Sequence, residues 1–291
     1  MTEKTPRTAL NQLFLSLLIV TLCGCGGPTP PPPAQDLPAK HAVIDDAAEP
    51  LPSAQEKDDG VSVDATPASP LGATVKASVD EIMLKLKRTL YTNSGYAEDP
   101  DCLLALDCSA YVKLVLKALP PEYYEVLPKS SKNGKTALAE DYYEYFRRAP
   151  ADPADAELWM QVKHIKDVQP GDIIAYKYTD SGKHSTTGHV MVAYSRPAQS
   201  RCDDADQYWV YVSDSANSGH RDDTRNGKGP FAPSFHYVAY NGSHGEPSGV
   251  GIGKLWFNTG SSPYYRWNSC SGNKHSDIQI AIGRPIRLKA E

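Results

Sequence analysis

The pattern of hydrophobic and polar positions predicts helices in the first part of the folded region and strands in the second. Hydrophobic residues at helical spacing indicate helices over residues 75–90, 110–119 and 136–148. From Pro170 onward, short runs rich in β-branched and aromatic residues alternate with loops. The predicted strands are residues 173–178, 189–195, 208–213, 235–240, 250–257 and 278–288. Helices followed by strands favour an α+β fold with an antiparallel sheet.

The second predicted helix begins beside a cysteine. Asp107 is a good N-cap, Cys108 follows it, and Pro120-Pro121 ends the helix. The hydrophobic stripe that packs this helix on the core consists of Val112, Val115, Leu116 and Leu119. A helix N-terminus lowers the pKa of a thiol through its unpaired N–H groups and its dipole. The position is therefore typical of a nucleophilic cysteine, and the alternative is an inert buried thiol.

The first 25 residues predict export. Lys4 and Arg7 precede a hydrophobic run over residues 13–22, which is too short to span a membrane and fits the core of a signal peptide. Residues 22–25 read Leu-Cys-Gly-Cys and resemble a bacterial lipobox, in which Cys25 is lipidated and becomes the mature N-terminus. The alternative is a buried helix with incidental cysteines. We expect a membrane-anchored lipoprotein of the cell envelope.

Residue 26 bears on the destination of such a lipoprotein. Gly26 stands where an aspartate would resemble an inner-membrane retention signal. In a bacterium with two membranes, we therefore expect the outer membrane, with the folded part in the periplasm.

Residues 26–75 predict a disordered linker between the anchor and a single folded domain over residues 76–291. The segment holds ten prolines, eight acidic residues, two lysines and no aromatic residue. Such a composition cannot bury enough surface to fold, and its prolines keep it extended. Residues 76–291 carry a net charge near zero, without the basic surface of a nucleic-acid-binding protein. We expect no nucleic-acid partner.

Three motifs carry a resemblance to a known family. Residues 107–112 read Asp-Cys-Ser-Ala-Tyr-Val, residues 169–174 read Gln-Pro-Gly-Asp-Ile-Ile, and residues 188–192 read Gly-His-Val-Met-Val. Their order resembles that of the NlpC-type cysteine peptidases over about residues 80–215. The resemblance implies a papain-like fold, with the cysteine helix packed on an antiparallel sheet. It also implies a peptide substrate, above all the stem peptides of peptidoglycan, although some members are amidases or acyl-transfer enzymes.

The resemblance assigns catalytic roles to particular residues. Cys108 would be the nucleophile and His189 the base, and the alternative for His189 is a core or strand-end histidine. The residue that orients the histidine usually lies on the next strand, where Asp214 is the candidate. Asn217 and His220 are the other candidates, and Asp214 could instead be a turn-forming residue that ends its strand.

The resemblance also suggests which groups stabilise the oxyanion, and the sequence departs from the family pattern in two ways. A tyrosine upstream of the cysteine often completes the oxyanion site in this family, and Tyr91 fits that position, with Tyr96 as the competitor. The backbone N–H of Cys108 would be a second donor. Ala110 replaces the usual glycine, and the loops after residues 119 and 195 are long.

The remaining cysteines leave the disulfide pairing open. An exported protein can hold a disulfide, and we expect Cys202–Cys270 as the pair, with Cys102 then free. A Cys102–Cys108 bridge in active protein would oppose the proposed nucleophile.

Several other features favour a structural interpretation. Gly249-x-Gly251-x-Gly253 leads into hydrophobic residues, so a glycine-rich strand or turn is favoured over a nucleotide loop. Arg225 could hold a substrate carboxylate, but a local salt bridge is favoured. The histidines without metal-ligand spacing, which we expect in surface loops, are His184, His236, His244 and His275.

Together these features predict a lipid-anchored cysteine hydrolase that cleaves an amide or peptide bond, as a monomer and without a metal or cofactor. Two alternatives use the same residues. One is a non-catalytic module that binds peptidoglycan or peptide in the same groove, and the other is an acyltransferase.

Overall fold

The computed structural model describes nine ranges of the chain. They are residues 63–93, 97–99, 103–131, 134–178, 186–200, 207–243, 245–258, 264–266 and 278–286. The predicted signal peptide, most of the predicted linker and eight residues discussed above lie outside them. Those eight residues are Cys25, Tyr96, Cys102, His184, Cys202, His244, Cys270 and His275.

Four α-helices lie in the first half of the described chain. They are α2 (Pro70–Lys85), α3 (Cys108–Leu116), α4 (Glu122–Glu125) and α5 (Ala139–Arg148). Helix α2 starts within the range predicted as linker, because Ser69 caps it by accepting the N–H of Gly72 at 3.0 Å. The helix predicted over residues 110–119 begins two residues earlier, at Cys108 itself.

A large antiparallel sheet forms the second half of the fold. Its strands are β4 (Trp159–Gln161), β5 (Ile173–Lys177), β6 (Gly188–Ala193), β7 (Ala198–Gln199), β8 (Gln207–Ala216), β10 (Gly249–Asn258), β11 (Tyr264–Arg266) and β12 (Ile278–Pro285). The strand order is β10-β11-β12-β5-β6-β8-β7, with β4 beside β12. Strand β10 also pairs with β8 over its whole length, so the sheet curls round until two distant strands meet. The α+β class with an antiparallel sheet is confirmed.

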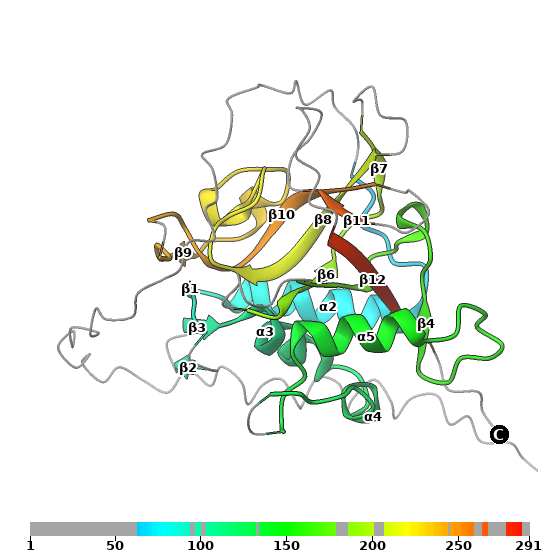
Figure 1. The fold of residues 1–291 in the computed structure, drawn as a ribbon. Helices are drawn as coiled ribbons and strands as arrows, with labels where there is room; N and C mark the ends of the chain where they lie inside the picture. Colours follow the sequence, from blue (N-terminus) through cyan, green and yellow to red (C-terminus); the bar gives the residue numbers. More distant parts are fainter. Residues whose placement is uncertain are drawn as a thin grey trace, which may run out of the picture.

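Both faces of the curled sheet are buried. Helices α2, α3 and α5 lie against one side of it (Figure 1), and the larger core fills the space between them, with Val190 and Val192 of β6 among its members. The alternate residues of the same strand, Met191 and Ala193, belong to a second core on the other face. Burial on both faces explains why these strands read as continuous hydrophobic runs rather than as an alternating pattern.

A smaller sheet leads to the cysteine helix. It contains β1 (Arg88–Tyr91), β2 (Ala97–Asp99), β3 (Leu103–Leu106) and β9 (Val238–Ala239), in the order β2-β3-β1-β9. Strand β1 runs parallel to both β3 and β9. The first three strands precede α3, so the prediction that all strands follow the helices is wrong for this segment. Strand β3 ends one residue before the helix cap, which fixes where α3 begins.

Three short 3₁₀ helices complete the described secondary structure: η1 (Ile165–Asp167), η2 (Thr224–Asn226) and η3 (Ala232–Ser234). In the described part of the chain, no helix combines the length and the apolar character that crossing a bilayer requires.

Candidate active site

The thiol of Cys108 lies at the N-terminus of α3. Asp107 caps the helix, and its Oδ1 accepts the N–H of Ala110 at 2.7 Å. Cys108 is a free cysteine and is buried, and its Sγ lies 3.9 Å from Oγ of Ser109. The first N–H groups of an α-helix have no acceptor within the helix, so the Cys108 N–H can donate to a negatively charged group beside the sulfur.

The imidazole of His189 lies at the start of β6. Strand β6 pairs with β5, where Tyr176 is the partner of His189 and their rings lie 5.9 Å apart. Gly188 allows this close approach, because its φ is +150° and a Cβ there would lie 2.0 Å from the carbonyl oxygen of Tyr176. The His189 side chain remains 14% exposed, so the ring is reachable from solvent.

His189 interacts with a sulfur on one side and a carboxylate on the other. Its Nε2 lies 2.6 Å from Oδ2 of Asp214. Burial alone would lower the pKa of His189, but the Cys108 charge and hydrogen bonds with Asp214 and Cys108 raise it to about 10. Because Nε2 faces the carboxylate, Nδ1 is the ring nitrogen left to exchange a proton with the thiol. This arrangement favours a thiolate–imidazolium pair.

Asp214 lies inside β8 rather than at its end. The strand continues to Ala216 and Asp214 is fully buried, so the alternative that Asp214 is a turn residue ending its strand is wrong. The two serines that flank Asp214 tie β8 to the cysteine helix and to β3, the strand that leads into that helix. Ser213 bonds the hydroxyl of Tyr111 at 2.5 Å, and Ser215 donates to the carbonyl oxygen of Leu106 at 2.7 Å. These two contacts fix α3 relative to the strand that carries the carboxylate.

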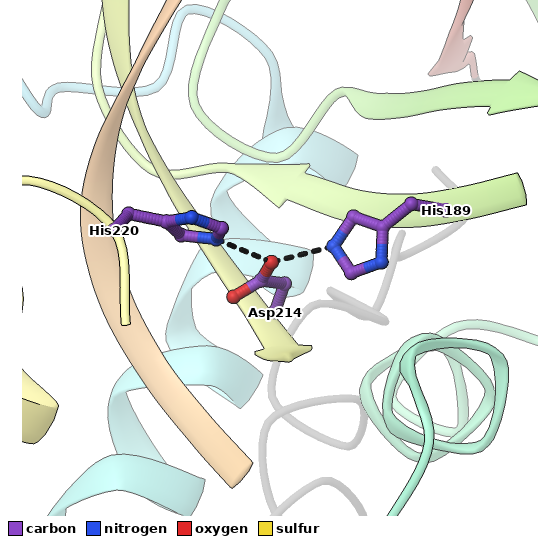
Figure 2. A group of neighbouring side chains, drawn as sticks. All are labelled: His189, Asp214 and His220. Carbon is purple, nitrogen blue, oxygen red and sulfur yellow. Dashed lines mark hydrogen bonds and ion pairs between the residues drawn. The ribbon is translucent and has the colours of Figure 1, made fainter. Parts of the chain in front are cut away.

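The carboxylate of Asp214 accepts two further donors. Nε2 of His220 lies 2.7 Å from the same Oδ2 that bonds His189, and Figure 2 shows the carboxylate between the two imidazole rings. The guanidinium of Arg225 bonds Oδ1. Burial would raise the pKa of Asp214, but the charges of His220 and Arg225, with the histidine hydrogen bonds, hold it well below its usual range. Asp214 therefore remains an anion in the core.

The other two candidates for the residue that orients His189 lie elsewhere. Asn217 lies beyond β8, where its amide bonds Oγ of Ser243 at 2.6 Å, so it does not reach His189. His220 lies behind Asp214, on the side away from His189 (Figure 2). The preferred role of Arg225 as a local salt bridge is confirmed, because its side chain is fully buried between Asp214 and Asp223.

Tyr91 belongs to the same cluster. It ends β1, where it pairs with Leu106 of β3, two residues before the nucleophile. Burial raises the pKa of Tyr91, and the negative charges of Cys108 and Asp107 raise it further. The hydroxyl thus stays protonated and is able to donate a hydrogen bond. Its competitor Tyr96 lies outside the described residues.

One group of described residues has the composition of a metal site. His189, Asp214 and His220 offer three ligand atoms that lie within 4.8 Å of one another. The two Nε2 atoms and Oδ2 already bond each other, however, and the guanidinium of Arg225 adds a positive charge on the same carboxylate. This donor set fits a hydrogen-bonded chain better than it fits a cation.

The sequence offers Asp214 and His220 as alternatives, whereas in the structure they belong to one network with His189. The sequence does not single out Asp223, which accepts the backbone N–H of His220 and a guanidinium N–H of Arg225, both at 2.7 Å. A signal was present in β8, where three consecutive polar residues, Ser213, Asp214 and Ser215, interrupt an otherwise hydrophobic strand.

Comparisons with protein-family models, with curated proteins and with solved structures found no match for this chain.

Proposed function

We propose that this protein is a cysteine hydrolase that cleaves an amide or peptide bond through Cys108, His189 and Asp214. The observation that carries the proposal is the position of the His189 ring, which interacts with the Cys108 thiol on one side and with a buried carboxylate on the other. A sulfur at a helix N-terminus, an imidazole and an orienting anion are the three parts that thiol catalysis requires.

The chemistry follows from these positions. The Cys108 sulfur attacks the carbonyl carbon and forms a C–S bond, while the carbonyl oxygen becomes an oxyanion that the Cys108 N–H and the Tyr91 hydroxyl stabilise. The imidazolium of His189 gives its proton to the leaving nitrogen as the C–N bond breaks. Neutral His189 then removes a proton from water, which attacks the acyl group and releases the sulfur. Asp214 holds the ring and stabilises its cation throughout.

The substrate class and location come from sequence features. The motifs at residues 107–112, 169–174 and 188–192 resemble those of NlpC-type peptidases, which favours peptidoglycan stem peptides as the substrate and a papain-like origin for the fold. The lipobox around Cys25 would anchor the enzyme to a membrane of the cell envelope.

Digestion of purified peptidoglycan by the full-length protein tests the proposal. We expect soluble peptides that mass spectrometry assigns to cleavage at one type of amide bond. Alkylation with iodoacetamide, mapped to Cys108, should abolish their release, whereas a metal chelator should leave it unchanged.

Other outcomes would contradict hydrolysis in specific ways. Sedimentation of the protein with peptidoglycan without release of any fragment would indicate the binding module. Transfer of the acyl group to an added amine, in preference to water, would indicate an acyltransferase.

Tyr91→Phe tests the oxyanion site. The substitution removes one hydroxyl donor and keeps the ring, so we expect kcat to fall about 10²-fold with little change in KM. Steady-state kinetics on a defined peptide would measure it. Tyr240→Phe is the matched control, since Tyr240 is 42% exposed, and an equal loss in both variants would exclude Tyr91 as a donor.

A further inference from the structure

The carboxylate of Asp214 has more donors than orientation of His189 requires. Oδ2 accepts Nε2 of both His189 and His220, at 2.6 and 2.7 Å, while Nη2 of Arg225 bonds Oδ1. The same Nη2 also donates to the backbone carbonyl of Asp214 at 2.8 Å. The acid is therefore fixed both at its side chain and at its main chain.

The donors behind Asp214 are themselves fixed by hydrogen bonds to Asp223 and to Gly249. Oδ2 of Asp223 accepts the backbone N–H of His220 and Nη1 of Arg225, both at 2.7 Å. Nε of Arg225 donates to the carbonyl of Gly249 at 2.7 Å. The loop over residues 220–225 thus folds around its own acid and presents an imidazole and a guanidinium to the same carboxylate. We call His220, Asp223 and Arg225 the Asp214 clamp.

Strand β10 has the shape that this clamp requires. It pairs with β8, where Gly251 is the partner of Asp214. A Cβ at Gly251 would lie 2.6 Å from Cγ of Arg225, and a Cβ at Gly253 would lie 2.4 Å from Oδ2 of Asp223 and 2.7 Å from Cβ of His220. Gly251 and Gly253 therefore leave room for the clamp, whereas Gly249 leaves room for β1, because a Cβ there would lie 2.3 Å from Oγ1 of Thr89.

A purely structural role explains this cluster poorly. Burying an ion pair removes two charges from water, and a hydrophobic core of equal volume is often as stable or more stable. Here two buried donors converge on the carboxylate that orients the reacting histidine. That convergence would be expected if the cluster serves the imidazole rather than the stability of the fold.

We propose that the Asp214 clamp positions Asp214 for His189, so that His220 and Arg225 act as positioning residues that do not touch the substrate. This inference rests on the proposed function. With both outer donors in place, Oδ2 stays directed at Nε2 of His189, which keeps the proton on Nε2 and leaves Nδ1 for the Cys108 sulfur. Without them, the carboxylate can rotate or accept water instead.

Substitutions in the full-length protein test the clamp. In Arg225→Lys we expect kcat to fall by roughly 10–100-fold with KM changed less than about twofold, as for other side chains that orient a reacting group. Arg284→Lys is the matched control, because Arg284 bonds Asp172 through two nitrogens, at 2.9 and 2.8 Å, far from this cluster in the sequence. It should lower the melting temperature without changing kcat.

Three further variants keep the test decisive if Arg225→Lys does not fold. Gly253→Ala removes no polar group but pushes on Asp223 and His220, so it should lower kcat in the same way. His220→Gln keeps an N–H donor and should retain more activity than His220→Leu. Equal kcat in these three proteins and the unsubstituted protein would overturn the clamp.

A spectroscopic readout separates this inference from the proposed function. The ring ¹⁵N shifts of His189 report its tautomer and charge without any substrate. We expect them to change in His220→Leu and Gly253→Ala but not in Arg284→Lys. Unchanged shifts would refute the clamp, whereas a protein that shows these changes yet hydrolyses no amide would refute the proposed function alone.

Discussion

Cys108→Ala protein is expected to fold as the unsubstituted chain does and to release no peptides from peptidoglycan. Removing the sulfur removes the only atom that can form the covalent intermediate in this mechanism. Loss of the nucleophile in hydrolases of this type lowers kcat on the order of 10⁶-fold. Mass spectrometry of the digest, with circular dichroism to verify the fold, would measure both effects. The stability should change little, because alanine keeps the helix start and the Asp107 cap.

Cys102→Ala is the matched control, since it removes a thiol six positions upstream in the sequence. We expect this variant to keep full activity and to be alkylated at Cys108 as before. Full hydrolysis by Cys108→Ala would end the assignment of the protein as a cysteine hydrolase, whatever the geometry around His189.

The helix that carries the nucleophile is predictable from sequence because its signals are local. An N-cap at Asp107, a hydrophobic stripe and two prolines lie within fifteen residues of one another. The strands after residue 170 are predictable for the same reason, since β-branched and aromatic runs are read within a short window. Helix α3 and strands β5, β6, β8, β10 and β12 all lie where these patterns place them.

The smaller sheet is not predictable in this way. Strands β1, β2 and β3 have three or four residues each, and β1 pairs in parallel with both β3 and the distant β9. Such short segments carry too few positions for a period to be recognised. The pairing of β10 with β8, which curls the large sheet, likewise depends on contacts between distant residues.

In the candidate site too, some features can be predicted from local sequence, whereas others depend on contacts between distant residues. The motifs around Cys108 and His189 predict that the two side chains meet, and in the structure they interact. From the sequence, the residue that orients His189 stays open among Asp214, Asn217 and His220, because the choice depends on how the chain returns after β8. That return brings His220 back onto Asp214 and directs Asn217 towards Ser243. Two residues that were treated as alternatives are therefore parts of one network.

The pH dependence of hydrolysis should reveal the link between His189 and Asp214. The pKa of His189 is raised from 6.5 to about 10, so the ring is cationic below pH 10 and neutral above it. The thiolate–imidazolium pair needs the cation, so activity should persist to about pH 10 and then fall as the pH rises further. The contribution of this pair to stability has the same sign. It is fully present below pH 6.5 and is lost as the pH rises through 10.

Asp214→Asn is expected to move that alkaline limb towards pH 6.5 and to lower kcat/KM at pH 8 by about 10²–10⁴-fold. The amide keeps the shape of the carboxylate but removes the charge that stabilises the imidazolium, and it can fix the wrong tautomer of His189. It also leaves Arg225 facing a neutral group in the core, which should destabilise the fold by about 3–5 kcal/mol. A pH–rate profile and a denaturant titration would measure the two effects separately.

Asp172→Asn separates catalysis from stability in this prediction. Asp172 is also a buried acid paired with an arginine, Arg284, so its loss should destabilise the fold without moving the pH–rate profile. Stability at acid pH also distinguishes the role of Asp214. Because its pKa lies well below 3.8, the stability that Asp214 contributes should be lost only as the pH falls below that value. An alkaline limb that stays near pH 10 in Asp214→Asn would mean that the cation of His189 depends on Cys108 alone. Asp214 would then be a structural acid, and the chemistry would reduce to a cysteine–histidine pair.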